Sequence, residues 1–166
     1  MGLYMLGGKE EKEMSATAAT KQAGSLVVAS DKLERTKVWG EDDATVLWQG
    51  AFATCGGKGA TMSSTIVYEI EPGGRLGWHT DQTEETQYIL AGNGTLHMED
   101  GSAHSLMPGS VFAIPANVRH DLANTGKETL RAVAFFAAAM FTQKFDNVML
   151  PPKTHVLGTP NREGEI

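Results

Sequence analysis

The sequence predicts an all-β protein, either an antiparallel sandwich or a barrel. Seven or more short segments between Ser25 and Ala137 are rich in β-branched and aromatic residues, which favour strands. Turns rich in Gly, Pro, Asn and Asp separate nearly every pair of these segments. A helical period is absent, except in the short stretch 137–144. Strands at this spacing are typical of sandwiches and barrels.

The expected strands follow one another from residue 25 onward. A glycine-rich stretch at 52–64 lacks the ending of a phosphate-binding loop, so we expect a flexible connection or a lid there. Many of the strands after it end in turns such as Pro72-Gly73 and Pro108-Gly109. With their turn residues included, the strand segments are 25–30, 36–39, 44–52, 64–74, 74–79, 85–94, 95–101, 104–109, 110–115, 118–126 and 128–137.

Length and composition favour one domain with an extension at each end. The chain has 166 residues, of which 41% are apolar, which suits a single compact core. We expect an N-terminal arm at 1–24 with a short helix around 9–17, a barrel domain at 25–150, and an irregular tail at 151–166. A core of this size needs neither disulfides nor a structural metal, so any bound metal is expected to serve function.

Charge and patterning exclude several classes of partner. The net charge is -6, and Lys and Arg are scattered rather than clustered, which argues against nucleic acid or an anionic membrane surface as partner. The single cysteine, Cys55, excludes an internal disulfide and is compatible with a reducing compartment. The longest apolar stretch, 132–141, is far shorter than the ~20 residues of a membrane-spanning helix. The N-terminus lacks a secretion pattern, so we expect a cytoplasmic protein.

Two short segments gather ionisable side chains at regular offsets. His79, Asp81 and Glu85 lie in the first, and His120 lies in the second. Because alternate residues of a strand share a face, His79 and Asp81 are expected to point the same way. Two imidazoles and two carboxylates from different strands can supply three or four ligands to one divalent ion and leave positions open for water or substrate.

These segments resemble the two motifs of the cupin superfamily. In the first, Gly73 or Gly74 is followed by His79, Asp81, Glu85 and Gly92 at the family's intervals, but Asp81 stands where the second histidine is expected. The second motif matches at Gly109, Pro115, Asn117, His120 and Asn124. Here Asn117 replaces a glycine, and asparagine tolerates a positive φ better than most residues. The resemblance covers about residues 60–140 and implies a double-stranded β-helix, or jelly roll, with a metal inside the barrel.

The aspartate at position 81 affects the expected cofactor. Replacing an imidazole with a carboxylate makes the ligand set harder and more anionic, which favours Fe or Mn, while Zn or Ni remains possible. One alternative is that His79, Glu85 and His120 bind the ion and Asp81 acts as a base. Another is a cupin that binds no metal and serves as a scaffold.

A second interpretation treats His79, Asp81 and His120 as the facial triad of Fe(II) oxygenases. Arg131 follows His120 by 11 residues, near the offset at which 2-oxoglutarate oxygenases carry a basic residue for the cosubstrate. The chain is short for that family, and the pattern from Glu85 to Asn124 has cupin features.

Three further side chains are candidates for roles in the barrel. Gln87 shares a face with Glu85 and is expected to act with Asp81 and Glu85 in catalysis; the alternative is a buried amide satisfied by backbone. Tyr68 and Arg131 are candidates for substrate binding, and for Arg131 the alternative is an outward side chain paired with an acid.

The resemblance permits several functions. We expect a metal-dependent enzyme acting on a small organic molecule, and the ligand set favours an Fe(II) dioxygenase. The alternatives are a non-redox isomerase, lyase or cyclase, and a non-catalytic cupin that binds a small ligand. Fold alone does not choose among them. An open sheet edge and the strands between Ser25 and Phe52 also favour a homodimer.

Overall fold

The computed structural model describes residues 26–160 and confirms the all-β prediction. Within these residues no helix is long and apolar enough to cross a membrane. The two helical elements are single 3-10 turns, η1 (Ser30–Lys32) and η2 (Gly56–Lys58). The strands are β1 (Thr36–Gly40), β2 (Leu47–Thr54), β3 (Ser64–Ile70), β4 (His79–Asp81), β5 (Glu85–Ala91), β6 (Gly94–Met98), β7 (Ala103–Leu106), β8 (Val111–Ile114), β9 (His120–Asn124), β10 (Leu130–Phe136), β11 (Thr142–Leu150) and β12 (Thr154–Gly158).

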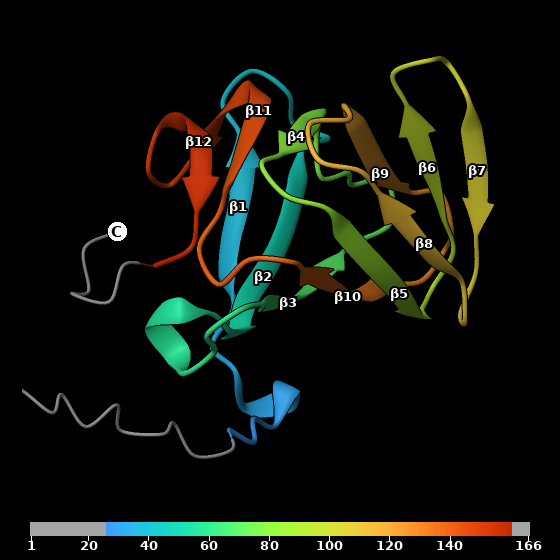
Figure 1. The fold of residues 1–166 in the computed structure, drawn as a ribbon. Helices are drawn as coiled ribbons and strands as arrows, with labels where there is room; N and C mark the ends of the chain where they lie inside the picture. Colours follow the sequence, from blue (N-terminus) through green and yellow to red (C-terminus); the bar gives the residue numbers. More distant parts are fainter. Residues whose placement is uncertain (1–25, 161–166) are drawn as a thin grey trace, which may run out of the picture.

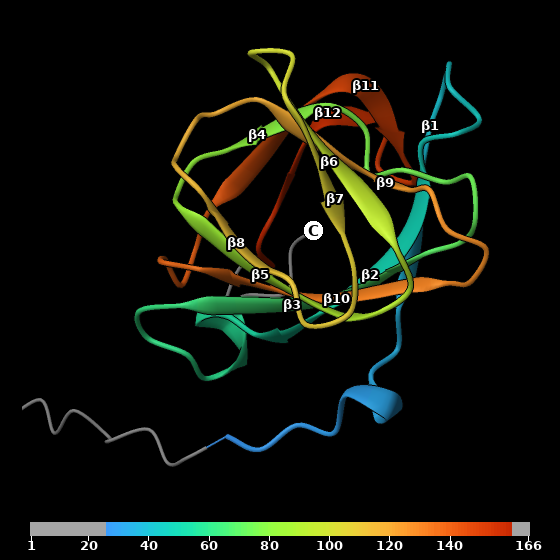
Figure 2. The same ribbon diagram turned by 90° about the vertical axis from the view of Figure 1, so that its right-hand side faces the viewer.

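The strands form one curled antiparallel sheet with the connectivity of a double-stranded β-helix. Its order is β7-β6-β9-β4-β11-β1-β2-β3-β10-β5-β8, and β12 pairs with β11. Figure 1 shows these strands as one curled sheet, and its order ends at β7 on one edge and at β8 on the other. Seen along the barrel in Figure 2, the strands run around a central axis. Neighbours such as β4 and β9 are therefore far apart in sequence, and residues from distant segments meet in the interior.

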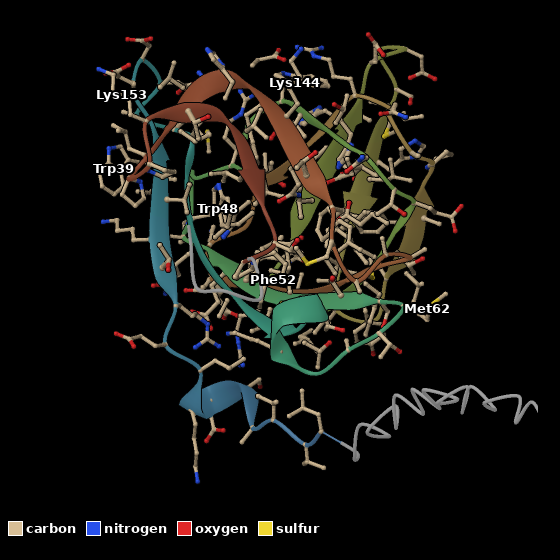
Figure 3. All side chains as sticks on the ribbon, turned by 60° about the vertical axis from the view of Figure 1, so that its left-hand side comes forward. Trp39, Trp48, Phe52, Met62, Lys144 and Lys153 are labelled. Atoms are coloured by element: carbon tan, nitrogen blue, oxygen red, sulfur yellow. The ribbon has the colours of Figure 1, made fainter. Side chains whose placement is uncertain are left out.

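Alternation along the strands separates the interior from the outer surface. In β10, Leu130, Ala132, Ala134 and Phe136 are buried, while Arg131 and Phe135 are exposed. The main core cluster includes Ile70, Ile89 and Leu122, each fully buried. Figure 3 shows Trp48 of β2 inside the ring of strands and Trp39 of β1 outside it.

Two segments expected to be strands are not. Residues 26–29 form no strand and lead into η1. Val27 is 92% exposed, so its apolar side chain has no sheet to pack against. In the segment 74–79, Arg75 forms only isolated bridges and β4 begins at His79. Gly77 interrupts the extended backbone because its φ is +92°.

The region after β10 also differs from expectation. The stretch 137–144, which has a helical period, forms no helix: bends at 137–140 lead into β11. β11 was not predicted, although it pairs with β1, β4 and β12. The expected irregular tail contains β12, which pairs with β11. The remainder of that tail beyond residue 160, and the helix expected around 9–17, lie outside the described residues.

Candidate metal centre

The register of β4 and β9 brings two histidines together. His79 and His120 are directly paired across these antiparallel strands, so their side chains leave the sheet on the same face. Their ring centroids are 4.3 Å apart. Both side chains are buried, with exposed fractions of 1% and 0%. Two segments separated by 40 residues thus supply two imidazoles to one point in the barrel.

β11 supports this pair from the other side of β4. Its register places Gln143 opposite Asp81 and Phe145 opposite His79. Gln143 Nε2 donates to Asp81 Oδ1 at 2.8 Å, and the Phe145 ring stacks on the His79 ring at 4.7 Å. Each of these contacts restricts the rotation of a side chain in the candidate centre.

Several buried polar atoms of the described residues converge here without a hydrogen-bond partner. Asp81 Oδ2 lies 3.8 Å from His79 Nε2 and 3.6 Å from His120 Nε2. Glu85 Oε2 lies 3.4 Å from His120 Nε2. Among residues 26–160, Asp81 Oδ2, Glu85 Oε2 and His120 Nε2 find no hydrogen-bond partner. Buried polar atoms are rarely left unpaired because the desolvation penalty is then uncompensated.

Both imidazoles are oriented as metal ligands usually are. His79 Nδ1 lies 2.8 Å from the carbonyl of Gly77, and His120 Nδ1 lies 2.9 Å from the carbonyl of Val118. A carbonyl can only accept, so each Nδ1 is the protonated nitrogen. In the neutral imidazole this leaves a lone pair on Nε2, the atom directed at the carboxylates.

Burial and neighbouring charges shift the pKa values of the cluster. Burial, together with the charge of His120, lowers the pKa of His79 from 6.5 to about 3. Burial and then the charge of Glu85 raise the pKa of Asp81 from 3.8 to about 7. Burial lowers the pKa of His120, but Glu85, the carbonyl of Val118 and Asp81 together raise it, and the net shift is upward. The metal-free cluster therefore holds protons that a cation would displace.

His79, Asp81 and His120 fit a divalent metal site. One ligand atom from each lies within 4.8 Å of the others, and all three residues are buried. Glu85, at the start of β5 and next to His120, offers an oxygen as a fourth ligand atom. Two imidazoles with one or two carboxylates are a donor set used for first-row divalent ions.

The Tyr68 side chain of β3 and the Gln87 side chain of β5 contact each other inside the barrel, across β10. Tyr68 pairs with Ala132 of β10, and Gln87 pairs with Ala134 of the same strand. These two alanines leave room for the Tyr68 hydroxyl to donate to Gln87 Oε1. Burial, then the charges of Glu85 and Asp81, raise the pKa of Tyr68 well above 10.0, so it stays protonated. Gln87 Nε2 has no partner among the described residues.

The structure places Arg131 away from this cluster, on the outer face of β10. Its side chain is 49% exposed, and its Nε lies 3.4 Å from Glu69 Oε1. Of the seven residues singled out from the sequence as site candidates, the other six are buried. The arginine therefore cannot anchor a ligand inside the barrel from this position.

A narrow pocket adjoins the cluster. Its free volume is about 20 Å³, and a single water needs about 10–15 Å³ by the same measure. His79, Glu85, Tyr68 and Gln143 supply its polar wall. Among the described residues, no lysine or arginine lines it. Its apolar wall is formed by Trp48, Ile66, Leu76, Ala134, Phe136 and Phe145.

The sequence of the barrel matches a known family. A family model described as "Cupin domain" matches residues 66–136, a range that contains the motifs with His79 and His120. The match supports a cupin domain over residues 66–136. Among curated proteins, none matches the sequence.

Solved cupin-like structures share the fold. A putative sugar phosphate isomerase from Acidithiobacillus ferrooxidans is 23% identical, with a TM-score of 0.56 over 72% of this chain and 80% of that one. The polyketide cyclase RemF from Streptomyces resistomycificus is 18% identical, with a TM-score of 0.58 over 68% and 79%. An oxalate decarboxylase from Lactobacillus farciminis is 19% identical, with a TM-score of 0.59 over 70% of this chain but only 34% of that one. At these identities the likeness shows the fold and leaves the reaction open.

The cupin motifs also account for the turns around the site. Asn117, at the position of the motif's glycine, adopts a φ of +63°. Gly92 has a φ of +75°, and a Cβ there would lie 2.7 Å from the backbone of Leu130. Asn124 Nδ2 donates to the carbonyls of Ile70 and Glu128. These motif residues shape the ends of the strands and do not enter the cluster.

Two residues near the cupin centre were missed from the sequence. Gln143 lies on β11, which was not predicted as a strand, and nothing in its immediate sequence points to a site. Asp121 follows His120 and is only 2% exposed. A carboxylate directly after the motif histidine, inside a predicted strand segment, was a signal that could have been used, since buried acids need partners.

Proposed function

We propose that this cupin is a mononuclear metal-dependent enzyme that acts on a small organic molecule, with Fe(II) dioxygenase chemistry as the leading candidate. The observation that supports this most directly is the convergence of His120 Nε2, Asp81 Oδ2 and Glu85 Oε2, three buried atoms without a hydrogen-bond partner among the described residues. His79 Nε2 faces the same point.

The proposed roles follow from these positions. His79, Asp81 and His120 hold the ion, and Glu85 either completes the ligand set or remains free as a base. When bound, Fe(II) in such a set offers open positions for substrate oxygen atoms and O2. Gln143 fixes the Asp81 carboxylate by its hydrogen bond. The apolar wall limits the water beside the ion, and Tyr68 and Gln87 offer hydrogen bonds to a substrate or to water.

The pocket constrains the substrate. With no lysine or arginine on its wall in the described residues, it offers a phosphate or a multiply charged acid no direct counter-charge. The small free volume implies either a compact substrate or movement of the surrounding side chains. The outward position of Arg131 also removes the support for a 2-oxoglutarate oxygenase, because that hypothesis needs an internal cation for the cosubstrate.

Proton-transfer chemistry, as in an isomerase, lyase or cyclase, is the second candidate. It is favoured by Glu85, which lines the pocket and lies outside the tight His79, Asp81 and His120 group. A carboxylate beside a bound substrate can move a proton while the ion stabilises the developing enolate charge.

Metal replacement distinguishes these candidates. The metal-free protein is loaded with Fe(II) or Zn(II) without air, and the Fe(II) form is exposed to nitric oxide as an O2 surrogate. The oxygenase proposal predicts an iron-nitrosyl EPR signal that is absent in His120→Ala. It also predicts that, when small enolisable carbonyl compounds are screened as substrates, the Fe(II) form takes up O2 and the Zn(II) form does not. Turnover by the Zn(II) form without O2 would contradict it and favour proton transfer. Failure to bind any metal would overturn both.

A further inference from the structure

An ion pair between half-buried Arg75 and buried Asp121 joins the two segments that supply the histidines, and the proposed chemistry does not use it. Arg75 precedes β4, and Asp121 follows His120 in β9. Arg75 Nε lies 2.9 Å from Asp121 Oδ2, and the side chains are 26% and 2% exposed. Taking a carboxylate out of water is costly even when it is paired. Both oxygens of the Asp121 carboxylate therefore need partners.

The second carboxylate oxygen leads to a metal-ligand candidate. Gly77 N donates to Asp121 Oδ1 at 2.8 Å. The carbonyl of the same Gly77 accepts from His79 Nδ1 at 2.8 Å. One carboxylate therefore fixes the residue whose carbonyl sets the tautomer and ring orientation of His79.

Gly77 needs such a constraint because of its backbone conformation. Its φ is +92°, and a Cβ there would lie 3.0 Å and 3.2 Å from the two methyl groups of Val46. Only glycine fits these conditions, and glycine has the largest conformational freedom to lose. The bond from Asp121 restricts that freedom immediately before β4 begins.

The Arg75 side of the pair is itself anchored. Arg75 N donates to the carbonyl of Thr45, and Leu47 N donates to the carbonyl of Arg75. Leu76 N donates to the carbonyl of Leu122 on β9. The segment 75–77 is thus fastened to β9 by backbone and side chain, close to both His79 and His120.

We propose that Asp121, held by Arg75, is a positioning residue of the metal centre: it fixes Gly77 and thereby directs His79 Nε2 toward the ion. The inference rests on the proposed metal-dependent function. Groups that orient a metal ligand typically change metal affinity by about 10- to 100-fold when they are removed.

Mn(II) binding, followed by EPR of the free and bound ion, tests this inference. Asp121→Leu removes both contacts and should raise the Kd for Mn(II) by about 10- to 100-fold. Asp121→Asn keeps an acceptor for Gly77 N, so its loss of Mn(II) affinity should be smaller than that of Asp121→Leu. Arg75→Lys should bind Mn(II) more tightly than Arg75→Gln because it retains the charge. Leu106→Ala, a buried core change on β7, should lower the thermal midpoint but leave the Kd within about twofold.

The outcomes separate this inference from the function on which it rests. Wild-type affinity for Mn(II) in Asp121→Leu would overturn the positioning role and leave the metal centre intact. The same holds if Leu106→Ala, compared at equal thermal stability, loses as much Mn(II) affinity as Asp121→Leu. Absence of Mn(II) binding by the wild-type protein would overturn the metal centre and the positioning role together.

Discussion

At the scale of single residues, the candidate centre is an arrangement that is unfavourable without a cation. Two carboxylates, Asp81 and Glu85, are buried to within 2% exposure beside two imidazoles. Their mutual repulsion and their burial are reflected in the raised pKa of Asp81. Ionisable groups with shifted pKa values are common at functional sites. Here the shift arises because Asp81 and Glu85 lie on the inward face of β4 and β5.

Asp81→Asn should stabilise the metal-free protein at neutral and higher pH. The folded-state pKa of Asp81 is about 7, against the ordinary value of 3.8 for an aspartate carboxyl. Because this pKa is raised, the contribution of Asp81 to stability is fully present below about pH 3.8 and is lost as pH rises through 7. Urea unfolding at pH 8 should show a gain of about 2–4 kcal/mol for the variant, shrinking as pH falls toward 4. Asp146→Asn, on the surface, is the control and should show no such pH-dependent gain.

Metal affinity should fall as the pH is lowered. Asp81 and His120 both have raised pKa values, so a cation must displace their protons. His79, with a pKa of about 3, stays neutral and adds nothing to this dependence. Below pH 7 the Kd for Mn(II) should rise about tenfold per pH unit for each proton displaced. Calorimetry in buffers of different ionisation enthalpy counts those protons, and a Kd independent of pH between 5.5 and 8 would count against this account.

At the scale of elements, the centre depends on which strands are neighbours. β4 is only three residues long, yet it lies between β9 and β11 and contributes two ligand candidates. Its two neighbours provide His120 on one side and the supports Gln143 and Phe145 on the other. The centre is therefore a property of three adjacent strands that are distant in sequence.

The contribution of β11 can be measured through Gln143. Gln143→Leu removes the donor to Asp81 Oδ1 and should weaken Mn(II) binding by about tenfold, because a freed carboxylate must be ordered again on binding. Lys144→Gln, one residue further and paired across to Thr80, should retain wild-type affinity. Equal affinities for the two variants would mean that β11 does not support the site.

At the scale of the whole molecule, the fold class was predictable because its signals are local. Alternation, turn residues and the two cupin motifs can all be read along the chain, and so could the shared face of His79 and Asp81. β11 and β12 were missed because the segment 142–158 mixes charged, amide and apolar residues without clean alternation. Its strand structure depends on pairing with β1 and β4, which is a long-range effect. Arg131 could not be placed from its offset, since one step along a strand reverses the face.

The expected homodimer stays a prediction that can be tested on the whole protein. Phe135 is 47% exposed and Val111 is 63% exposed on the outer faces of β10 and β8, and exposed apolar groups favour association. Sedimentation equilibrium at micromolar concentration should give twice the chain mass of 17.8 kDa. Phe135→Asp should shift the equilibrium toward monomer if this face takes part. A single monomeric species at all concentrations would refute the expectation.

The most direct measurement for the metal centre is anomalous scattering from crystals grown with Mn(II), compared between wild-type protein and His120→Ala. The account predicts one strong peak per chain, within bonding distance of the Nε2 atoms of His79 and His120 and of Asp81, and no peak at that position in the variant. A wild-type crystal without that peak, or a variant crystal that keeps it, would contradict the account.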